Sequence, residues 1–593
     1  MDIKDESQDE SNGFDRFQRE LIRRHLADVR AQPDNFEYWE KLVRACEQLD
    51  GGINRNSHPW AIEMVRSVYN RFLRKYPLLF GYWKKYAKLE FIIGGTECAE
   101  LVYERGCASV TNSVDLWMEY CSFKMETCHD AEIVRELFER AADHVGIDFL
   151  SHPFWDKWLE YEERLENADK ILAILKRVTR IPMHQYARYY KDLRTLAVDR
   201  PLQELVPAVE LTRYRLEIEA ECQAFGLPPK VDLELERDLR AKIAARFYAA
   251  FQACEADTNS RWAFEAGIKR PYFHVTELDH AQLATWRKYL DFQEAQGDYA
   301  KTVFLYNRCL VSCACYDEFW FRYVRWIGAQ KDKEEEVRHI YIRAAQLVPV
   351  TRPGIRLQFA YFEESCGRVD IARAIYKAIL RKLPESVETT TSWANLERRQ
   401  IGVEAAVAVY KARIDSTGVD PFAKAALVTE WATLLWKAQG SVVGARRVYQ
   451  EHEERYADSR QFWQRYMQFE MEQPISSEDH EFHVSLRLME IIDQILTKSR
   501  LSPWIKQEFT QMYMNYVQQR RDKAAMKEFI SLDRDIPQSV SRLTRAKFRK
   551  DINGLPVGGL DEATRVRAEK RYYNFYELHR DPDPNAEGPA PFY

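Results

Sequence analysis

The stretch IKRPYFHVTELDHAQLATWRKYLDFQEAQGD, residues 268–298, opens the part of the chain that decides the fold. Its second half places Trp286, Tyr289 and Phe292 three residues apart, and an aromatic trio with the same spacing begins 34 residues later at Trp320. Positions 0, +3 and +6 of a helix lie on one side, so each trio forms an apolar stripe. The apolar runs that accompany these helices end in tyrosines at the same interval, at Tyr306, Tyr341 and Tyr376. These intervals predict a repeated helix–turn–helix unit.

A single helix cannot bury such a stripe, whereas stacked helix pairs can. In a stack, each pair hides its aromatic side chains against the next pair, and stability is roughly a sum over repeats and their interfaces. The sequence therefore predicts an all-α fold, an α-solenoid (superhelix) of stacked helix pairs. Function in such a chain usually resides in long surfaces, and no pocket is needed.

The repeat register divides the chain into parts. An earlier array shows first-helix tryptophans at Trp83 and Trp117, then the register is lost for nearly a hundred residues that still read as helical. The pair Pro228-Pro229 makes a stiff break in that segment. We predict an acidic, disordered N-terminus at 1–13, an N-terminal array at 14–182, a helical connector at 183–280, a C-terminal array at 281–535 and a C-terminal extension with a basic cluster at 536–593.

Charge and cysteine content limit the classes of function. The chain has 593 residues, 87 basic and 92 acidic, for a net charge of −5. Domains that wrap nucleic acid usually carry a basic excess, so we expect RNA contact to be local at most. The 11 cysteines lack disulfide-framework spacing, which favours a reducing compartment. Because no run of 18 apolar residues occurs and the N-terminus is acidic, the sequence predicts neither a membrane span nor a signal peptide.

Enzyme signatures are absent from the sequence. It contains no phosphate loop, dinucleotide-binding glycine motif, zinc-protease H-E-x2-H or nucleophile elbow. Two groups invite a zinc interpretation, but neither has paired C-x2-C units, so we expect no metal. These groups are Cys121, Cys128 and His129, and Cys309, Cys313 and Cys315. We predict a protein that is not an enzyme and that has no cofactor and no small-molecule substrate.

The aromatic residues of the repeats are predicted to be packing residues rather than platforms for bases. The acidic residue at +7, as in Glu90 and Glu470, is expected to cap a helix or to form an inter-helix hydrogen bond. An arginine stands two residues after each second-helix aromatic residue in the first array, and we expect most of these to be solvated or salt-bridged. The predicted repeat-core residues are Trp83, Tyr86, Tyr103, Trp117, Tyr120, Trp286, Tyr289, Tyr306, Trp320, Tyr323, Tyr341, Tyr376, Trp463 and Tyr466.

Two further clusters are candidates for contacts. In the connector, Arg270, Tyr272, Phe273 and His274 either cap the second array and fix its angle or contact a partner. Near the C-terminus five positive charges could meet RNA phosphates, an acidic partner or an import receptor, or form a solvated face. These residues are Arg542, Arg545, Lys547, Arg549 and Lys550.

The two helix motifs together resemble the HAT (half-a-TPR) repeat. The first helix reads W-x2-Y-x2-[FL]-x-E, and the second contains segments such as VRSVYNR, VRELFER and VRHIYIR. The resemblance covers roughly residues 36–182 and 281–470. It implies a scaffold of an RNA-processing complex, the kind of assembly in which HAT arrays are mainly found.

A narrower resemblance comes from RWAFEAGIKRPYFHVTELDHAQLATWRKYLDF, residues 261–292, together with two HAT arrays joined by a helical connector. This combination is similar to the pre-mRNA-processing factor 39 family. The resemblance implies a nuclear, non-enzymatic scaffold of the U1 small nuclear ribonucleoprotein. It implies action in pre-mRNA splicing at 5′ splice-site recognition and alternative 5′ splice-site choice, through protein–protein contacts.

The same resemblance implies dimerisation through the C-terminal array, as a homodimer or as a heterodimer with a paralogous HAT protein. An aromatic helix supplies the candidate dimer contacts Trp504, Phe509, Tyr513 and Tyr516. Two alternatives stay open. One is a HAT scaffold of another RNA-processing complex, such as mRNA 3′-end cleavage, and the other is a direct RNA-binding protein that uses the C-terminal basic cluster.

Overall fold

The computed structural model describes residues 13–225, 228, 231–474, 478–520 and 525–535. Within these ranges every regular element is a helix, and no strand occurs. The fold is an all-α solenoid, as predicted. The chain forms two compact units, residues 1–383 and residues 384–593, which are described separately below. The boundaries predicted from the repeat register, including those of the connector, stay a prediction.

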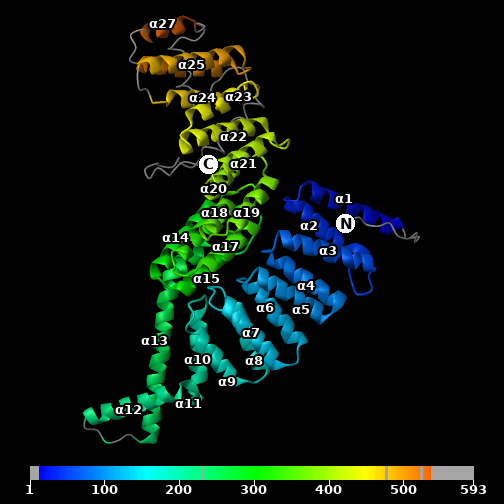
Figure 1. The fold of residues 1–593 in the computed structure, drawn as a ribbon. Helices are drawn as coiled ribbons and strands as arrows, with labels where there is room; N and C mark the ends of the chain where they lie inside the picture. The colour runs from blue at the N-terminus through cyan, green and yellow to red at the C-terminus, as the bar shows by residue number, and fades with distance from the viewer. Residues whose placement is uncertain (1–12, 226–227, 229–230, 475–477, 521–524, 536–593) are drawn as a thin grey trace, which may run out of the picture. The chain divides into compact units, whose positions relative to one another are not determined.

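The first unit contains the N-terminal repeats, the long connector helix and three further helix pairs (Figure 1). Its helices are α1 (Gly13–Ala31), α2 (Phe36–Glu47), the 3-10 turn η1 (Leu49–Gly51), α3 (Pro59–Lys75), α4 (Phe80–Gly94), α5 (Thr96–Ser109), α6 (Val114–Thr127), α7 (Ala131–Val145), α8 (His152–Arg164), α9 (Ala168–Val178), α10 (Tyr186–Val198), α11 (Leu202–Leu205), α12 (Ala208–Ala224), α13 (Asp232–Gly267), α14 (His280–Gln296), α15 (Tyr299–Ser312), α16 (Asp317–Gly328), α17 (Glu334–Leu347), α18 (Gly354–Ser365) and α19 (Val369–Lys382).

The second unit continues the pattern of antiparallel pairs. Its helices are α20 (Val387–Gln400), α21 (Val403–Asp415), α22 (Pro421–Thr433), the π-helical turn η2 (Leu434–Ala438), α23 (Val442–His452), α24 (Arg460–Met471), α25 (Glu478–Thr497), α26 (Pro503–Gln519) and α27 (Ala525–Asp535). In both units a helix contacts the next helix and often the next but one, as α4 contacts α5 and α6. This is the contact pattern of a solenoid, in which each pair meets only its neighbours.

Side-chain caps set the start of several repeat helices. Ser113 begins α6 by accepting a hydrogen bond from the amide of Leu116 at 3.3 Å. Ser459 begins α24 in the same way, with the amide of Phe462 as donor. Such caps satisfy amide groups that have no partner within the helix. They therefore fix where each aromatic stripe begins.

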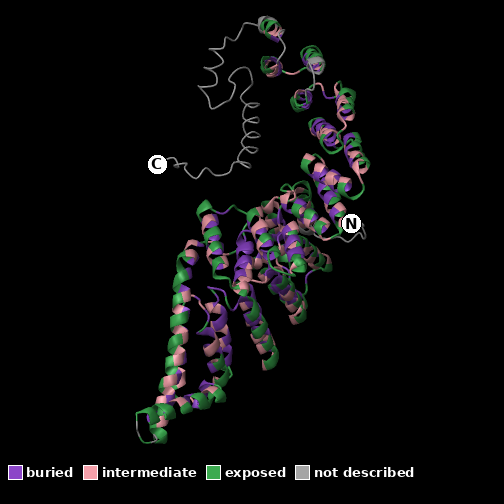
Figure 2. Cartoon of the chain, turned by 60° about the vertical axis from the view of Figure 1, so that its left-hand side comes forward, coloured by how far each residue is buried: buried purple, intermediate pink, exposed green. Residues whose placement is uncertain are grey.

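Stacked aromatic rings explain the period of the repeat. The second-helix Tyr69 lies parallel to Tyr86 of the next repeat, with ring centroids 4.8 Å apart. The same stack recurs between Tyr306 and Tyr323 at 4.5 Å. Further members of the series are Tyr103–Tyr120 and, in the second unit, Tyr449–Tyr466. Since both rings of each stack belong to different repeats, one repeat alone would leave them exposed to water. Figure 2 shows the buried residues along the sides of helices that face each other.

Several first-helix tryptophans are held by a recurring hydrogen bond, although the indole nitrogen of Trp286 has no partner. The indole nitrogen of Trp83 donates to the carbonyl oxygen of Pro77, six residues earlier, at 2.8 Å. Trp320 donates to Ala314 in the same way at 2.8 Å. The same bond occurs at Trp39, Trp117 and Trp463. A buried indole N–H without a partner would be costly, so this bond allows the large ring to be fully buried.

The connector is dominated by α13, a helix of 36 residues. The short helix α11 and the helices α10 and α12 contact it. Most of α13 is exposed or half-buried, as Figure 2 shows. Its C-terminal end behaves differently, because Phe264 stacks on Tyr289 with centroids 5.0 Å apart. The last turns of α13 therefore act as the second helix of a repeat.

Candidate functional site

The residues predicted as the repeat core lie inside the two units. All fourteen are buried, with exposures of 5% or less. Trp286, Trp320 and Tyr306 have no exposed surface at all. These rings pack against the next repeat and cannot serve as platforms for nucleic-acid bases. The aromatic stripes of the repeats are therefore core and not surface.

Ion pairs also join successive repeats. The Arg66 guanidinium on α3 donates to Glu90 on α4, with Nε–Oε1 and Nη2–Oε2 distances of 2.9 and 2.7 Å. Arg66 lies three residues before the second-helix tyrosine, and Glu90 is the +7 acid of the next first helix. The same pair recurs at Arg135–Glu162, Arg338–Glu363 and Arg446–Glu470. The inter-helix hydrogen bond predicted for Glu90 and Glu470 is confirmed.

One repeat carries this pair with its charges exchanged. Lys124 stands at the +7 position, where the other repeats have an acid, and its amine lies 2.6 Å from Glu100. Glu100 is three residues before Tyr103, where the other repeats have an arginine. The pair is therefore a property of the repeat interface and not of either residue alone.

A second series of arginines covers the first-helix tryptophans. Arg105, two residues after Tyr103, lies with its guanidinium carbon 5.5 Å from the ring centre of Trp83. It also donates to Asn70 of the preceding second helix at 2.9 Å. The same stacking occurs at Arg71–Trp39, Arg140–Trp117, Arg177–Trp155, Arg308–Trp286 and Arg343–Trp320. These arginines therefore contact tryptophan rings of the solenoid itself.

The candidate connector residues form a loop before α14. Arg270 donates to the Thr276 hydroxyl and carbonyl at 2.9 and 2.8 Å, and the His274 ring lies 2.8 Å from the same hydroxyl. Phe273 is buried and belongs to the apolar core of the N-terminal repeats. Tyr272, at 46% exposure, and His274 present their surfaces to solvent. The geometry is that of a segment that fixes the start of α14.

Sequence reasoning missed a buried polar junction within the first unit. Arg308 on α15 donates to Glu265 on α13 through two nitrogens, at 2.5 and 2.7 Å. Its Nε lies 3.0 Å from Asp148, in the loop between α7 and α8. Tyr289 on α14 also donates to Glu265, at 2.8 Å. Three consecutive helices, α13, α14 and α15, therefore meet the distant α7–α8 loop at this junction.

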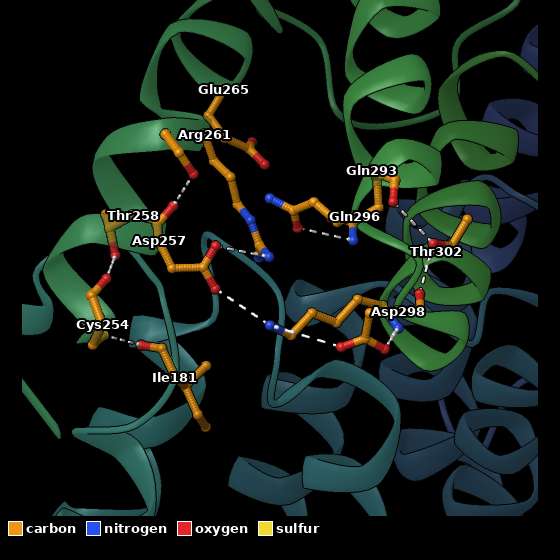
Figure 3. Close-up of polar contacts among 12 residues, drawn as sticks. Ile181, Cys254, Asp257, Thr258, Arg261, Glu265, Gln293, Gln296, Asp298 and Thr302 are labelled. Atoms are coloured by element: carbon orange, nitrogen blue, oxygen red, sulfur yellow. Dashed lines mark hydrogen bonds and ion pairs between the residues drawn. The ribbon is translucent and has the colours of Figure 1, made fainter.

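Burial and pairing act against each other at this junction. Burial disfavours the charge of Arg308, but Asp148 and Glu265 outweigh it and raise the pKa of the guanidinium. Burial also raises the pKa of Asp148, and Arg308 opposes that rise. A cavity of about 410 Å³ lies beside the junction and is lined by residues of α13, α14 and α15 and of the segment after α9. Some of its polar residues appear in Figure 3.

The candidate dimer residues of α26 lie in different environments. Phe509 and Tyr513 are buried in the core of the second unit, and Tyr513 donates to Glu528 of α27. Tyr516 is half-buried, and only Trp504, at 53%, is strongly exposed. Because Phe509 and Tyr513 hold α26 against its own neighbours, Trp504 is the member of the set that offers free surface.

Exposed apolar residues gather instead on the neighbouring helix α25. Phe482, Leu486, Met489 and Leu496 are 40–55% exposed. Residues 482, 486 and 489 are spaced by four and three positions, so they share one side of the helix. Met526 and Ile530 of α27, each 51% exposed, add to the apolar surface of the terminal helices. We call the four residues of α25 the α25 stripe.

The remaining sequence expectations concern charge, metals and membranes. The basic cluster from Arg542 to Lys550 lies outside the described residues. Over the described ranges no group of three or more His, Cys, Asp or Glu side chains is placed to hold a metal ion. The described helices also include none that is long and apolar enough to cross a membrane.

Comparison with known proteins gives a consistent result. The family model of the PRP39 N-terminal HAT repeat matches residues 23–195, and that of the PRP39 C-terminal HAT repeat matches residues 259–399. Pre-mRNA-processing factor 39 of Schizosaccharomyces pombe is 42% identical over 98% of this chain and 97% of its own length.

More distant relatives share part of the chain. Pre-mRNA-processing factor 39 of Homo sapiens is 31% identical over 64% of this chain and 58% of its own length. The U1 small nuclear ribonucleoprotein component PRP42 of Saccharomyces cerevisiae is 24% identical over 62% of this chain and 66% of its own length. On the strength of the near full-length match and the two family models, this chain belongs to the pre-mRNA-processing factor 39 family of HAT-repeat proteins.

Proposed function

We propose that this chain is a non-enzymatic scaffold of the U1 small nuclear ribonucleoprotein that acts in the nucleus in pre-mRNA splicing. Its contribution is to hold protein components together at 5′ splice-site recognition and so to influence alternative 5′ splice-site choice. The observation that carries the proposal is the 42% identity to a pre-mRNA-processing factor 39 over 98% of the chain. The similarity to PRP42 of Saccharomyces cerevisiae, a U1 small nuclear ribonucleoprotein component, supports the assignment to that particle.

The placement of side chains in the structure supports a scaffold function. The repeat aromatics are buried in the core, and the acids at +7 are paired with arginines between repeats. What remains is an extended outer surface, which suits docking of several proteins rather than catalysis on a small molecule. Specificity in such a protein would come from partner contacts along successive helices.

The test is purification of the tagged full-length protein from its own cells, followed by identification of the bound RNA and proteins. Recovery of U1 RNA with U1 proteins is the expected result. Recovery of 3′-end cleavage factors without U1 RNA would assign the scaffold to a different machine. RNA binding by the purified protein alone, with a steep salt dependence, would favour a direct RNA contact.

We further propose that the chain dimerises through its terminal helices, with the α25 stripe and Trp504 in the contact. The support is the exposed apolar surface of Phe482, Leu486 and Met489, because an apolar face at the end of a solenoid gains free energy when a second surface covers it. The simplest partner for this face is a second copy of the chain, which gives a homodimer. A paralogous HAT protein would use the same face in a heterodimer.

Sedimentation of the full-length chain at micromolar concentration tests this contact. The double variant Leu486→Glu, Met489→Glu is expected to shift the protein to monomer. The matched control is Leu101→Glu, which places the same charge on an exposed leucine of α5 and should leave the dimer intact. A monomeric wild type in the absence of other proteins would limit the proposal to heterodimers, and an unchanged dimer in the double variant would refute it.

A further inference from the structure

A second cavity of the first unit is lined by the C-terminal end of α9, by α11 and the two residues that follow it, and by α13. Its volume is about 790 Å³, within the range of ligand-binding cavities in proteins. The lining carries one carboxylate, that of Glu204, and four basic side chains. The basic residues are Lys176, Arg177, Arg180 and Arg246. This basic lining stands out in a chain whose net charge is −5.

Two of the four cations already have carboxylate partners. Arg177 lies 2.6 Å from Glu139 on the preceding second helix, α7. Arg246 of α13 pairs with Glu210 of α12. These two arginines are therefore largely neutralised within the solenoid, and the remaining positive charge of the lining comes from α9 and the residues just after it.

The other two cations, Lys176 and Arg180, form no ion pair with an acid in the part of the chain that the structure describes. Lys176 donates to the backbone carbonyl of Glu204, whose carboxylate pairs instead with Arg200 at 3.1 Å. Burial lowers the pKa of Lys176, Glu204 opposes that change, and Arg180 and Arg246 add to it. Like charges that gather in this way cost free energy, which a bound anion would offset. We call Lys176 and Arg180 the two unpaired cations.

The two unpaired cations match a phosphate group better than a single carboxylate. A phosphorylated serine or threonine carries about 1.5 to 2 negative charges at neutral pH and three acceptor oxygens. Hydrogen bonds between such a group and a cationic side chain are among the strong ones. The rest of the lining includes apolar side chains on which the residues next to the phosphate could pack, and these are Leu205, Val206, Pro207 and Phe247.

Carboxylates around the cavity disfavour a nucleic acid as its occupant. Asp143 lies 3.6 Å from Arg177 and Asp169 lies 2.9 Å from Arg200, and both carboxylates are 76% exposed. A polyanion that followed the surface past the cavity would meet these acids, and nucleic-acid affinity depends on several phosphates being neutralised together. A single phosphate group inside the cavity faces a lining with one carboxylate.

We propose that this cavity binds a phosphorylated serine or threonine of a partner protein, with the phosphate group on Lys176 and Arg180 and the flanking peptide against Leu205, Pro207 and Phe247. Docking of that partner would then depend on phosphorylation, because the unmodified segment lacks the charge that the two unpaired cations require. This inference rests on the proposed scaffold function and specifies the chemistry of one of its partners.

The test variant carries Lys176→Gln and Arg180→Gln, which remove both unpaired cations. Neither side chain belongs to the buried core, so the fold is expected to be retained. The matched control carries Lys191→Gln and Arg194→Gln, which remove the same charge from exposed positions of α10 outside the cavity lining. Equal melting temperatures of the two variants check that the fold is intact.

The probe is a peptide library with a fixed central phosphoserine flanked by random residues, selected on the full-length wild-type protein. Selected peptides should bind at least about tenfold more weakly to the test variant than to wild type, and equally well to the control, because charge-assisted contacts are lost. Removing the phosphate group from the selected peptide should weaken binding by at least about tenfold as well. This second comparison uses only the wild-type protein and so does not depend on the folding of a variant.

Three outcomes would overturn the inference: no selected phosphopeptide, equal binding of the phosphorylated and unphosphorylated forms, or equal binding by the test variant and wild type. Inorganic phosphate that binds as tightly as the peptide would overturn it in favour of a free anion. A single-stranded RNA oligonucleotide that displaces the peptide and fails to bind the test variant would overturn it in favour of RNA. The proposed function fails separately, because recovery of U1 RNA with the purified wild-type complex is measured without any phosphopeptide.

Discussion

Replacing Arg308 by Met tests the polar junction of the first unit. The substitution leaves Asp148 and Glu265 buried, with side-chain exposures of 6% and 4%, and without their cation. Removing one member of a buried ion pair typically costs about 3–5 kcal/mol, because the remaining charge is not solvated. Met fills a similar volume, so the loss of packing adds little. We therefore expect the free energy of unfolding of the first unit to fall by about 3–5 kcal/mol.

A matched control separates this effect from the loss of stacking on tryptophan. Arg343 occupies the same repeat position as Arg308, with its guanidinium 5.8 Å from the ring of Trp320 compared with 5.9 Å from Trp286. It donates to the neutral side chain of Asn307 at 2.8 Å. Arg343→Met should cost only about 1 kcal/mol. The difference between the two variants measures what the buried carboxylates contribute.

Urea unfolding followed by tryptophan fluorescence, with hydrogen exchange on residues 146–151, gives the readout at pH 8 and at pH 5. Burial already raises the pKa of the Asp148 carboxyl and Arg308 opposes that rise, so without Arg308 this pKa rises further and the folded variant binds a proton more tightly than the unfolded chain. Its deficit relative to wild type should therefore shrink as the pH falls. Equal losses in Arg308→Met and Arg343→Met, or a deficit that does not depend on pH, would refute the reasoning.

The repeat interfaces allow three further predictions. Lys124→Glu places like charges against Glu100 and should lower stability by about 1 kcal/mol, while adding Glu100→Lys should restore most of it in a double-mutant cycle. Gly106→Ala brings a methyl group to 3.1 Å from Trp83 and should lower the melting temperature, by about 1–3 kcal/mol in stability, whereas Gly81→Ala meets nothing within 4 Å and should not. Because burial raises the pKa of several tyrosines, spectrophotometric titration should show phenolate formation at higher pH in the folded chain than in the urea-unfolded chain. For the same reason, stability should fall as the pH rises from about 10 to about 12. Those with a pKa of about 12 are Tyr76, Tyr86, Tyr323, Tyr341 and Tyr410.

The sequence indicated the repeat core because aromatic side chains leave a regular signal. Trp286 and Tyr289 are separated by one helical turn, and burial of that face is the main source of stability in a helix pair. The +7 acids were also predictable as hydrogen-bond partners, since their spacing places them on the same side as the aromatic residues. Neither inference needed knowledge of how distant repeats approach each other.

The candidate contact residues were harder to predict. Phe273 is an aromatic residue of the kind that often binds a partner, yet it is buried. Tyr513 is also buried and donates a hydrogen bond to Glu528 in its own unit. Exposure depends on which helices happen to cover a side chain, and no local spacing encodes it. The α25 stripe was overlooked for the complementary reason, because Phe482 and Leu486 have the spacing of ordinary core residues.

By itself, the sequence determined the helical period, the aromatic interfaces between adjacent repeats and the absence of familiar catalytic motifs, because these depend on residues within about one repeat of each other. Only the tertiary structure decided that Asp148, Glu265 and Arg308 meet. Those contacts join segments whose separation along the chain follows no helical spacing, so their free energy arises from the folded arrangement and not from any local pattern.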